Sequence, residues 1–369
     1  MQKLIDQFSR FFVGSLFIFS GLIKLNDPVG TQIKMEEYFE VFASDFGSFF
    51  NHFIPWSLEI GMAMIILELA LGVAILVFWR MKLTGWVLLL LMVFFTFLTF
   101  YSAYFNKVTD CGCFGDAIKL TPWQSFTKDV VLMVFVGHLF WYKHTYVAKL
   151  RTREGDALII ATIVVCTVLG VYAIQHLPFI DFRAYRVGNI IQDQMQPTEQ
   201  PIIEYVFEKD GKEIRSEKYL TDPGYKYISS RVLNEDKIKP KITDYSVTSV
   251  EGEDKTSASF QGNKLLIIVA NVDKASTKNI GAIRNLIQKS EGKVEAMVLT
   301  ASTNEAIEKF RHENQLAAPY YFVDATVLKT IIRSNPGIAL WQNGKVLGNW
   351  HYNDVPSEQE IFDLISSNR

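Results

Sequence analysis

The chain has 369 residues, of which 49% are hydrophobic and 14% aromatic, and its formal net charge is −2 at pH 7. The near-neutral charge and the lack of a long basic tract argue against nucleic-acid binding, and three cysteines are too few for a disulfide-stapled scaffold. A chain of this length has room for two or three domains. Apolar residues dominate its first half and charged residues its second, which predicts a membrane domain joined to a soluble part.

Five apolar runs in the first half predict five membrane-spanning helices, because most reach the roughly 20 residues that cross a hydrocarbon core. The first run resembles a secretory signal, but it lacks a small-residue cleavage pattern and ends at Asp27-Pro28, so an uncleaved helix is predicted. Tryptophan and tyrosine residues at the ends of the runs are typical of membrane interfaces. The runs are residues 11–23, 56–79, 83–104, 123–142 and 158–172.

Basic residues beside the runs predict the orientation, since cytoplasmic loops are enriched in lysine and arginine. They gather before the first run, between the second and third, and between the fourth and fifth, which lie on one side of a five-span bundle. The N-terminus is therefore predicted in the cytoplasm, the bundle in the lipid bilayer, and the C-terminal part on the outer side of the membrane. The basic residues are Lys3, Arg10, Arg80, Lys82, Lys143, Lys149, Arg151 and Arg153.

Three domains are predicted: an α-helical transmembrane domain over residues 1–180, a β-rich extracytoplasmic connector over 181–262, and an α/β domain over 263–369. In the connector, two strand-like stretches flank Asp210-Gly211, a dipeptide typical of tight hairpin turns. In the last domain, a buried-strand pattern opens an alternation of strands and helices that ends in a hairpin and a helix.

The order of elements in the last domain resembles the thioredoxin fold, whose hallmark cis proline is predicted at Pro336. Active thioredoxins carry a Cys-x-x-Cys pair where the first helix begins. That position reads Asp273-Lys274-Ala275-Ser276 here, and no cysteine follows Cys166. Asp273 and Ser276 are good caps for a helix over residues 276–290. We therefore expect a domain without dithiol chemistry that docks an extended client peptide beside Pro336.

Two of the three cysteines lie in one loop between the third and fourth predicted spans, Asp110-Cys111-Gly112-Cys113-Phe114-Gly115-Asp116. A redox-active dithiol is one interpretation, because thiol–disulfide exchange needs one thiolate to attack and another to resolve the mixed disulfide. A structural bridge that pins the loop to itself is the second. A metal half-site is the third, although His52 and His176 on the outer side add no recognisable ligand set.

Two carboxylates lie within the second predicted span, where an ionisable residue usually marks function or a paired partner. Glu59 is near the outer end, and Lys24 of the first span is predicted to be its ion-pair partner. Glu68 is near mid-membrane without an obvious cation. It is predicted either to stay protonated and hydrogen-bond to a neighbouring helix, or to relay protons beside a quinone-like acceptor. Cys166 in the fifth span is predicted to be a small buried hydrophobe.

The loop sequence from Asp110 to Gly115, followed by a span that begins at Pro122-Trp123, resembles the signature of the DoxX and MauE-like membrane proteins. The first span and Glu68 are similar to further positions of this family, and the resemblance covers roughly residues 7–180. With its connector and last domain, the chain resembles the long DoxX-like proteins of Bacteroidota. MauE-type proteins are thought to help the maturation of disulfide-bearing extracytoplasmic proteins, so the resemblance implies thiol–disulfide exchange at Cys111 and Cys113.

Two functions are compatible with these features. The first is a component of a thiol–disulfide oxidoreductase system, in which Cys111, Cys113 and Glu68 carry the chemistry and a quinone is the candidate acceptor. Its partner would be an extracytoplasmic client or a thioredoxin-like protein, because such a relay usually uses two cysteine pairs and this chain has one. The alternative is a non-enzymatic envelope scaffold or assembly factor with a structural Cys111–Cys113 bridge.

Overall fold

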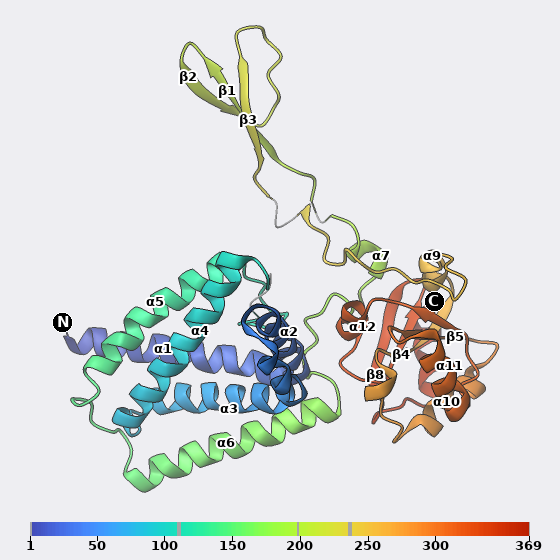
Figure 1. The fold of residues 1–369 in the computed structure, drawn as a ribbon, viewed down its shortest axis with the longest axis horizontal. Helices are drawn as coiled ribbons and strands as arrows, with labels where there is room; N and C mark the ends of the chain where they lie inside the picture. The colour runs from blue at the N-terminus through green and yellow to red at the C-terminus, as the bar shows by residue number, and fades with distance from the viewer. Residues whose placement is uncertain (1, 109–111, 198, 235–237, 369) are drawn as a thin grey trace. The chain divides into compact units, whose positions relative to one another are not determined.

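A computed structural model of the chain describes residues 2–108, 112–197, 199–234 and 238–368 (Figure 1). The chain forms two compact units, Met1–Phe182 and Arg183–Arg369. Unit 1 is helical, and unit 2 contains two β-sheets together with shorter helices.

Unit 1 is a bundle of five long helices, in which α1 packs on α3, α5 and α6, α3 packs on α4 and α6, and α4 packs on α5 (Figure 1). A sixth helix, α2, and the 3-10 segment η1 connect α1 to α3 in the chain. The bounds are α1 Gln2–Asn26, α2 Pro28–Phe46, η1 Ser48–Trp56, α3 Ser57–Leu76, α4 Met81–Phe105, α5 Pro122–Trp141 and α6 Thr152–Gln175.

The surface of unit 1 identifies it as a membrane domain. Among the described residues, four segments are long and apolar enough to cross a membrane: α1, η1 together with α3, α4 and α6. Large apolar side chains cover the outer surfaces of α4 and α6, for instance Leu90 at 63% exposure and Val168 at 62%. A broad band of exposed apolar side chains suits contact with lipid and not with water.

Helix α5 is the fifth long helix of the bundle, but it does not meet the same length and composition criteria as the other four. It contains Gln124, Lys128, Asp129 and His138, which lower its apolar character. The prediction of five spans is therefore not confirmed. The helix nevertheless packs against α1 and α4 as a part of the same bundle.

Helices α1 and α3 approach each other closely because glycines lie at their contact. A Cβ atom on Gly72 would lie 2.8 Å from Cγ1 of Ile18 and 3.1 Å from the carbonyl oxygen of Gly14. Gly21 packs against Leu69 one turn nearer to the start of α3. Partner numbers on α3 fall as residue numbers on α1 rise, so the two helices are antiparallel, and this register determines which of their polar residues meet.

The three-stranded sheet of unit 2 has the order β2-β1-β3, and both neighbours of β1 are antiparallel to it. The β1–β2 hairpin turns at Asp210 and Gly211, whose φ values of 52° and 73° suit a two-residue turn, so the predicted hairpin is confirmed. Phe207 is its most enclosed residue at 1% exposure, and it contacts the rings of Tyr219 and Tyr227. The bounds are β1 Ile203–Lys209, β2 Lys212–Ser216 and β3 Lys226–Val232.

The five-stranded sheet has the order β6-β5-β4-β7-β8, in which β4, β5 and β6 are parallel and β7 and β8 are antiparallel to their neighbours. One face packs on α10, α11 and α13. The predicted alternation of strands and helices, the closing hairpin and helix, and the cis peptide bond before Pro336 are confirmed. The bounds are α7 Ile191–Gln194, α9 Thr256–Phe260, β4 Asn263–Val269, η2 Val272–Lys274, α10 Ile280–Ser290, β5 Glu295–Thr300, α11 Asn304–Asn314, β6 Tyr320–Phe322, α12 Ala325–Ile331, β7 Gly337–Gln342, β8 Lys345–His351 and α13 Glu358–Ser367.

The opposite face of this sheet is covered by segments from both ends of the predicted connector. The ring of Trp341 on β7 has its centre 6.3 Å from that of Tyr185, 5.7 Å from that of Tyr245 and 6.1 Å from that of Phe260. All four side chains are buried. These two segments therefore complete the core of the α/β part, while the division of the chain into three domains stays a prediction.

The first helix of the α/β part begins later than predicted. Asn279, not Ser276, occupies the N-cap of α10. The main-chain N–H of Ser276 instead donates to the carbonyl of Asn335 at 2.9 Å, which holds this residue in a loop. Asp273 belongs to the short turn η2. The helix caps predicted at Asp273 and Ser276 are therefore wrong, because Asp273 lies in η2 and the contact with the segment before Pro336 keeps Ser276 in the loop before α10.

The close contact of α1 and α3 predicts that Gly72→Ala destabilises the bundle. The added methyl group meets Ile18 and the main chain of Gly14, which has little room to yield. We expect the free energy of unfolding to fall by about 1–3 kcal/mol, the usual cost of overpacking, measured by thermal unfolding of the detergent-solubilised protein. Gly137→Ala on α5 is the matched control, because no atom lies within 4 Å of its added Cβ. Equal losses of stability in the two variants would contradict the assigned helix contact.

Candidate functional site

The loop that connects α4 to α5 carries the predicted thiol pair. Cys111 lies outside the described residues, and Cys113 is half-buried. Contacts before and after the two cysteines attach the loop to α1, α2 and α5, and they define the site.

The start of the loop is attached to α2. Asn106 ends α4 in a left-handed conformation with φ 51°, and Val108 is fully buried. The ammonium of Lys107 and the hydroxyl of Tyr101 both donate to the carboxylate of Asp45 at the end of α2. The hydrogen bond from Lys107, followed by that from Tyr101, holds the pKa of Asp45 below its usual range. A charge-assisted contact therefore fixes the side of the loop that precedes the cysteines.

From residue 112 onward the loop forms a tight turn. Gly112 and Gly115 have φ values of 67° and 50°, which side chains rarely adopt, and the N–H of Gly115 donates to the carbonyl of Gly112 at 3.1 Å. Phe114 is 7% exposed, and its ring centre lies 5.7 Å from that of Phe19 on α1. Cys113 is thus part of a compact turn whose aromatic residue is packed into the bundle.

Helix α1 binds Cys113 directly. The hydroxyl of Ser20 donates to the main-chain carbonyl of Cys113 at 2.8 Å. Lys24 lies one turn further along the same face of α1, because residues four apart in a helix are neighbours. Its ammonium is within electrostatic range of Cys113. The half-buried cysteine therefore has an almost enclosed lysine beside it.

Lys24 also forms a buried ion pair with Glu68 of α3. Its Nζ lies 2.6 Å from Oε2 of Glu68, and the two side chains are 13% and 5% exposed. The predictions that Lys24 pairs with Glu59 and that Glu68 lacks a cation are therefore wrong. Glu59 is exposed. The reason is the helix register: Gly21 packs against Leu69, so the next turn of α1 meets Glu68, whereas Glu59 lies about 2.5 turns away along α3.

A second buried ion pair lies on α5 next to the same turn. Lys128 pairs with Asp129, whose side chain is 2% exposed and accepts a hydrogen bond from Thr99 of α4 at 3.0 Å. The ammonium of Lys128 lies 5.7 Å from the ring centre of Phe114 and is within electrostatic range of Lys24. Two lysines from different helices, each with its own carboxylate, therefore flank the turn that contains Cys113.

Helix α2 adds a third lysine. A Cβ atom on Gly112 would lie 3.2 Å from Cγ of Lys34, so the stem of this side chain lies against the loop. Its ammonium pairs with Glu37 at 2.9 Å, and the two side chains are 30% and 36% exposed. Cations from α1, α2 and α5 thus lie around the loop, and cations near a cysteine stabilise its thiolate form.

The surroundings of Glu68 do not fit a proton relay beside a quinone, because its carboxylate is nearly enclosed and already bound to Lys24. Among the described residues, no three His, Cys, Asp or Glu side chains gather into a group that could hold a metal ion. Cys166 is 6% exposed among apolar side chains, which confirms the prediction of a buried hydrophobe. Among the described residues of unit 1, the loop therefore remains the candidate site.

The segment before Pro336, where a peptide groove is predicted, contacts another part of the chain. The carbonyl of Asn335 already accepts a hydrogen bond from Ser276. Main-chain bridges also join Thr248 to β6 and Ile190 to β8, the two edge strands of the five-stranded sheet. Strand addition needs unpaired main-chain groups at a sheet edge, so these contacts do not favour peptide docking at this sheet.

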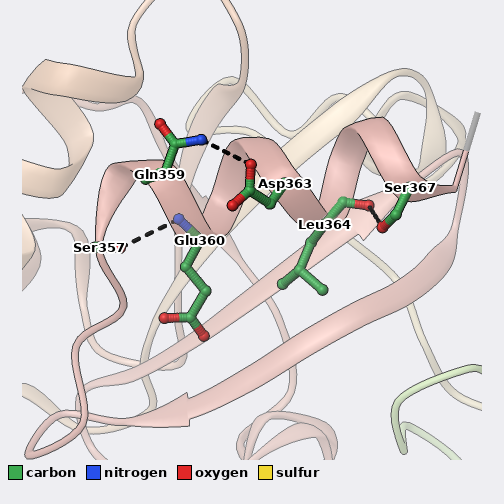
Figure 2. Close-up of a pocket in the computed structure, with 6 residues that line it drawn as sticks. All are labelled: Ser357, Gln359, Glu360, Asp363, Leu364 and Ser367. Atoms are coloured by element: carbon green, nitrogen blue, oxygen red, sulfur yellow. Dashed lines mark hydrogen bonds between the residues drawn. The ribbon is translucent and has the colours of Figure 1, made fainter.

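A shallow depression on α13 shows no comparable chemistry (Figure 2). Ser357 caps this helix by accepting from the N–H of Glu360, and Gln359 donates to Asp363 one turn later. Its polar groups therefore stabilise the helix itself, and we assign no site to it. The remaining lining residues are Leu364 and Ser367.

The sequence predictions missed Ser20, Lys34, Lys128 and Asp129 at the site. The adjacent charges Lys128 and Asp129 stand within an apolar run, and that position was itself a signal of pairing or function. Ser20 has no such signal, because its role arises from the packing of α1 against the loop. Ser20 and Lys24 precede Lys128 and Asp129 by more than a hundred positions in the sequence, yet helix packing places all four residues around the loop.

Comparison with known proteins supports the membrane part of this picture. The protein-family model described as methylamine utilisation protein MauE matches residues 2–142, which confirms the predicted similarity to MauE proteins for this stretch. Protein TlpB of Flavobacterium psychrophilum is 31% identical over 137 residues, or 36% of this chain and 35% of that protein. The chain thus spans about a third of the length of this relative.

Solved structures similar to the chain include a secreted disulfide oxidoreductase of Mycobacterium tuberculosis, which is homologous to DsbE of E. coli. It is 13% identical with a TM-score of 0.26, over 34% of this chain and 96% of that chain. StoA of Bacillus subtilis is also 13% identical with a TM-score of 0.26, over 32% of this chain and 94% of that chain. The thioredoxin-like order of elements in unit 2 is established by the strand pairing within the five-stranded sheet and not by these matches.

The hydrogen bond from Ser20 predicts that Ser20→Ala loosens the loop. Losing one hydrogen bond costs about 1 kcal/mol, which corresponds to about a fivefold change in a local opening equilibrium. We expect hydrogen–deuterium exchange of the amides in residues 112–117 to accelerate by this factor, read by mass spectrometry of the full chain. Ser15→Ala is the control, because Ser15 is exposed on the same helix. Unchanged exchange in Ser20→Ala would show that the hydrogen bond does not hold the loop.

Proposed function

We propose that this chain is a membrane component of extracytoplasmic thiol–disulfide exchange, with Cys111 and Cys113 as its redox pair. One observation carries the proposal: Ser20 binds the main chain of Cys113 to α1, while lysines of three helices lie around the loop. Each lysine contributes a positive charge that stabilises a nearby thiolate, and the thiolate is the form that attacks a disulfide. The resemblance to MauE-type proteins implies the same role.

The exchange balances between the pair and one client disulfide. One thiolate of the pair attacks a client sulfur, so that a mixed disulfide forms and the client's other sulfur leaves as a thiolate. The second thiolate of the pair then attacks the mixed disulfide, closes the Cys111–Cys113 bridge and releases the client's remaining thiolate. The client gains two electrons and takes up two protons, and the pair loses two electrons. The reverse sequence oxidises a client dithiol with the same balance.

The proposal places the loop on the extracytoplasmic side of the inner membrane, with α5 as the fifth span and residues 183–369 in the periplasm. Two ion pairs support this arrangement at the opposite end of the helices: Arg80–Asp156 joins the starts of α4 and α6, and Asp6–His138 joins the start of α1 to the last turn of α5. The basic residues in the first three turns of α1 and those between these helices therefore lie towards the end that the positive-inside rule assigns to the cytoplasm.

Unit 2 is proposed to dock a client or a partner. Its sequence contains no cysteine, so it has no dithiol chemistry of its own. Because chain segments bridge both edge strands of the five-stranded sheet, we assign docking to the three-stranded sheet. Its strand β3 is an edge strand whose residues 226–231 are all exposed, which suits the addition of an extended segment.

Cysteine-to-serine substitutions test the redox pair. Cys111→Ser and Cys113→Ser each leave one thiol in the loop, so a mixed disulfide with a client that forms there is not resolved within the chain. We expect at least one of these variants to accumulate a covalent complex in intact cells, seen on non-reducing gels after acid quenching and alkylation. Mass spectrometry then identifies the client.

The matched control is Cys166→Ala, which removes the third cysteine and is expected to trap nothing. The double variant Cys111→Ser/Cys113→Ser is expected to abolish every adduct. A structural bridge in a scaffold protein predicts a different result: a disulfide that stays oxidised under every growth condition and no trapped partner in either serine variant. That result would overturn the redox proposal in favour of the scaffold.

A further inference from the structure

The ammonium of Lys24 lies between two acidic groups of different chemistry. On one side it contacts the Glu68 carboxylate at 2.6 Å, and on the other it is within electrostatic range of the Cys113 thiol. Both the lysine and the glutamate are nearly enclosed, so water screens their charges weakly. The positive charge of Lys24 can therefore stabilise the thiolate of Cys113, and the negative charge of Glu68 can reduce this stabilisation.

The direction of the Lys24 side chain follows from helix geometry. Ser20 and Lys24 are four residues apart on α1 and therefore lie on one face. Because Ser20 binds the carbonyl of Cys113, that face is turned toward the loop. The ammonium of Lys24 also lies 5.1 Å from the ring centre of Phe95 on α4. Contacts with Glu68 of α3 and Phe95 of α4 thus hold the ammonium of Lys24, on the face of α1 that meets the loop.

We propose that Lys24 is a positioning residue that stabilises the thiolate of Cys113, and that Glu68 sets the reactivity of this thiol by competing for the same ammonium. The inference deepens the proposed function, on which its biological meaning rests. The other charged groups around Lys24 are Lys128 and Asp129 of α5, which form a pair of their own.

The two halves of the pair have opposite effects in this arrangement. Removing the carboxylate of Glu68 leaves the full charge of Lys24 to the thiolate. Removing the ammonium of Lys24 leaves a carboxyl group and no cation from α1 beside the sulfur. A purely structural ion pair behaves differently, because breaking it from either side loses the same contact. Opposite changes in the reactivity of the Cys113 thiol therefore indicate that the pair tunes the thiol, whereas changes in the same direction indicate a purely structural ion pair.

The test uses the full-length protein in detergent with Cys111→Ser and Cys166→Ala, so that Cys113 is the one remaining thiol of the three in the sequence. The rate of alkylation by iodoacetamide is measured across a pH series, and its midpoint reports where the thiolate forms. We expect Lys24→Met to raise this midpoint by about one pH unit and Glu68→Gln to lower it by a similar amount, as for a neighbouring charge that is gained or lost.

Two further variants keep the test decisive. Lys34→Met is the matched control, because this lysine also lies at the loop but is more exposed and paired with Glu37, so its midpoint should move by less than about 0.3 pH unit. Lys24→Met/Glu68→Gln carries neither charge, and its midpoint is expected between those of the two single variants. It also serves if Lys24→Met alone fails to fold.

Shifts in the same direction, or no shift in proteins that keep the parental melting temperature, would overturn the inference. Failure of this inference is distinguishable from failure of the proposed function. The alkylation test uses a protein with a single thiol, which cannot complete an exchange reaction, so it measures only the reactivity of Cys113. Opposite shifts together with no trapped client would leave Lys24 and Glu68 as tuning residues of a thiol that has no exchange partner.

Discussion

The buried ion pair between Lys24 and Glu68 is the interaction on which the geometry of the thiol loop depends. Glu68 lies near the middle of α3, where an unpaired charge costs about 2.5–3.5 kcal/mol or more, and Lys24 lies in the last turn of α1. The two helices therefore cannot slide past each other without leaving both charges unpaired. The close glycine contact of the two helices allows the approach that this pair needs. The register so obtained also determines where Ser20 meets the loop.

The loop is held by balanced charges and not by a simple positive patch. Lys24, Lys34 and Lys128 each have a carboxylate partner, so the surroundings of the loop are close to neutral when the thiols are neutral or bridged. Ionisation of a thiol adds one negative charge to this group. The energy of that charge depends on which lysines are enclosed, because buried pairs are screened less than exposed ones. Lys24 is the most enclosed of the three, and its effect on the loop is therefore the largest.

Much of the fold was predictable from local patterns, and the helix-to-helix contacts were not. The Asp210-Gly211 turn and the strand–helix alternation up to Pro336 depend on neighbouring residues, and they were predicted correctly. Of the five apolar runs, four correspond to segments that are long and apolar enough to cross a membrane among the described residues. The partner of Lys24 depends on the register between two helices, which one sequence does not contain. Depth alone suggested Glu59, whereas the glycine contact selects Glu68.

In unit 2, too, contacts between distant segments could not be predicted from the sequence. The position of Ser276 depends on a hydrogen bond to a segment about sixty residues away, and that contact outweighs its preference for a helix cap. The aromatic side chains that pack on Trp341 come from both ends of residues 181–262, a stretch whose composition predicts a connector. At the site, the cysteine pair of the loop and the charge of Glu68 could be identified from the sequence. Ser20 could not, because the role of a serine in an apolar helix depends on the segment that packs against it.

Recognition of a client needs more surface than the described turn around Cys113 provides. The turn around Cys113 is short, and its one large side chain, Phe114, packs into the bundle and not outward. Thiol–disulfide exchange needs the two reacting sulfurs to meet in a defined geometry, which a small turn cannot impose on a folded client. Orientation must therefore come from another surface. In the proposed function, the exposed strand β3 of unit 2 holds the client. Because unit 2 has no cysteine, such a client would react at the loop or with an external partner. The chemistry and the recognition are thus assigned to different parts of one chain, and the loop needs only to be reactive and reachable.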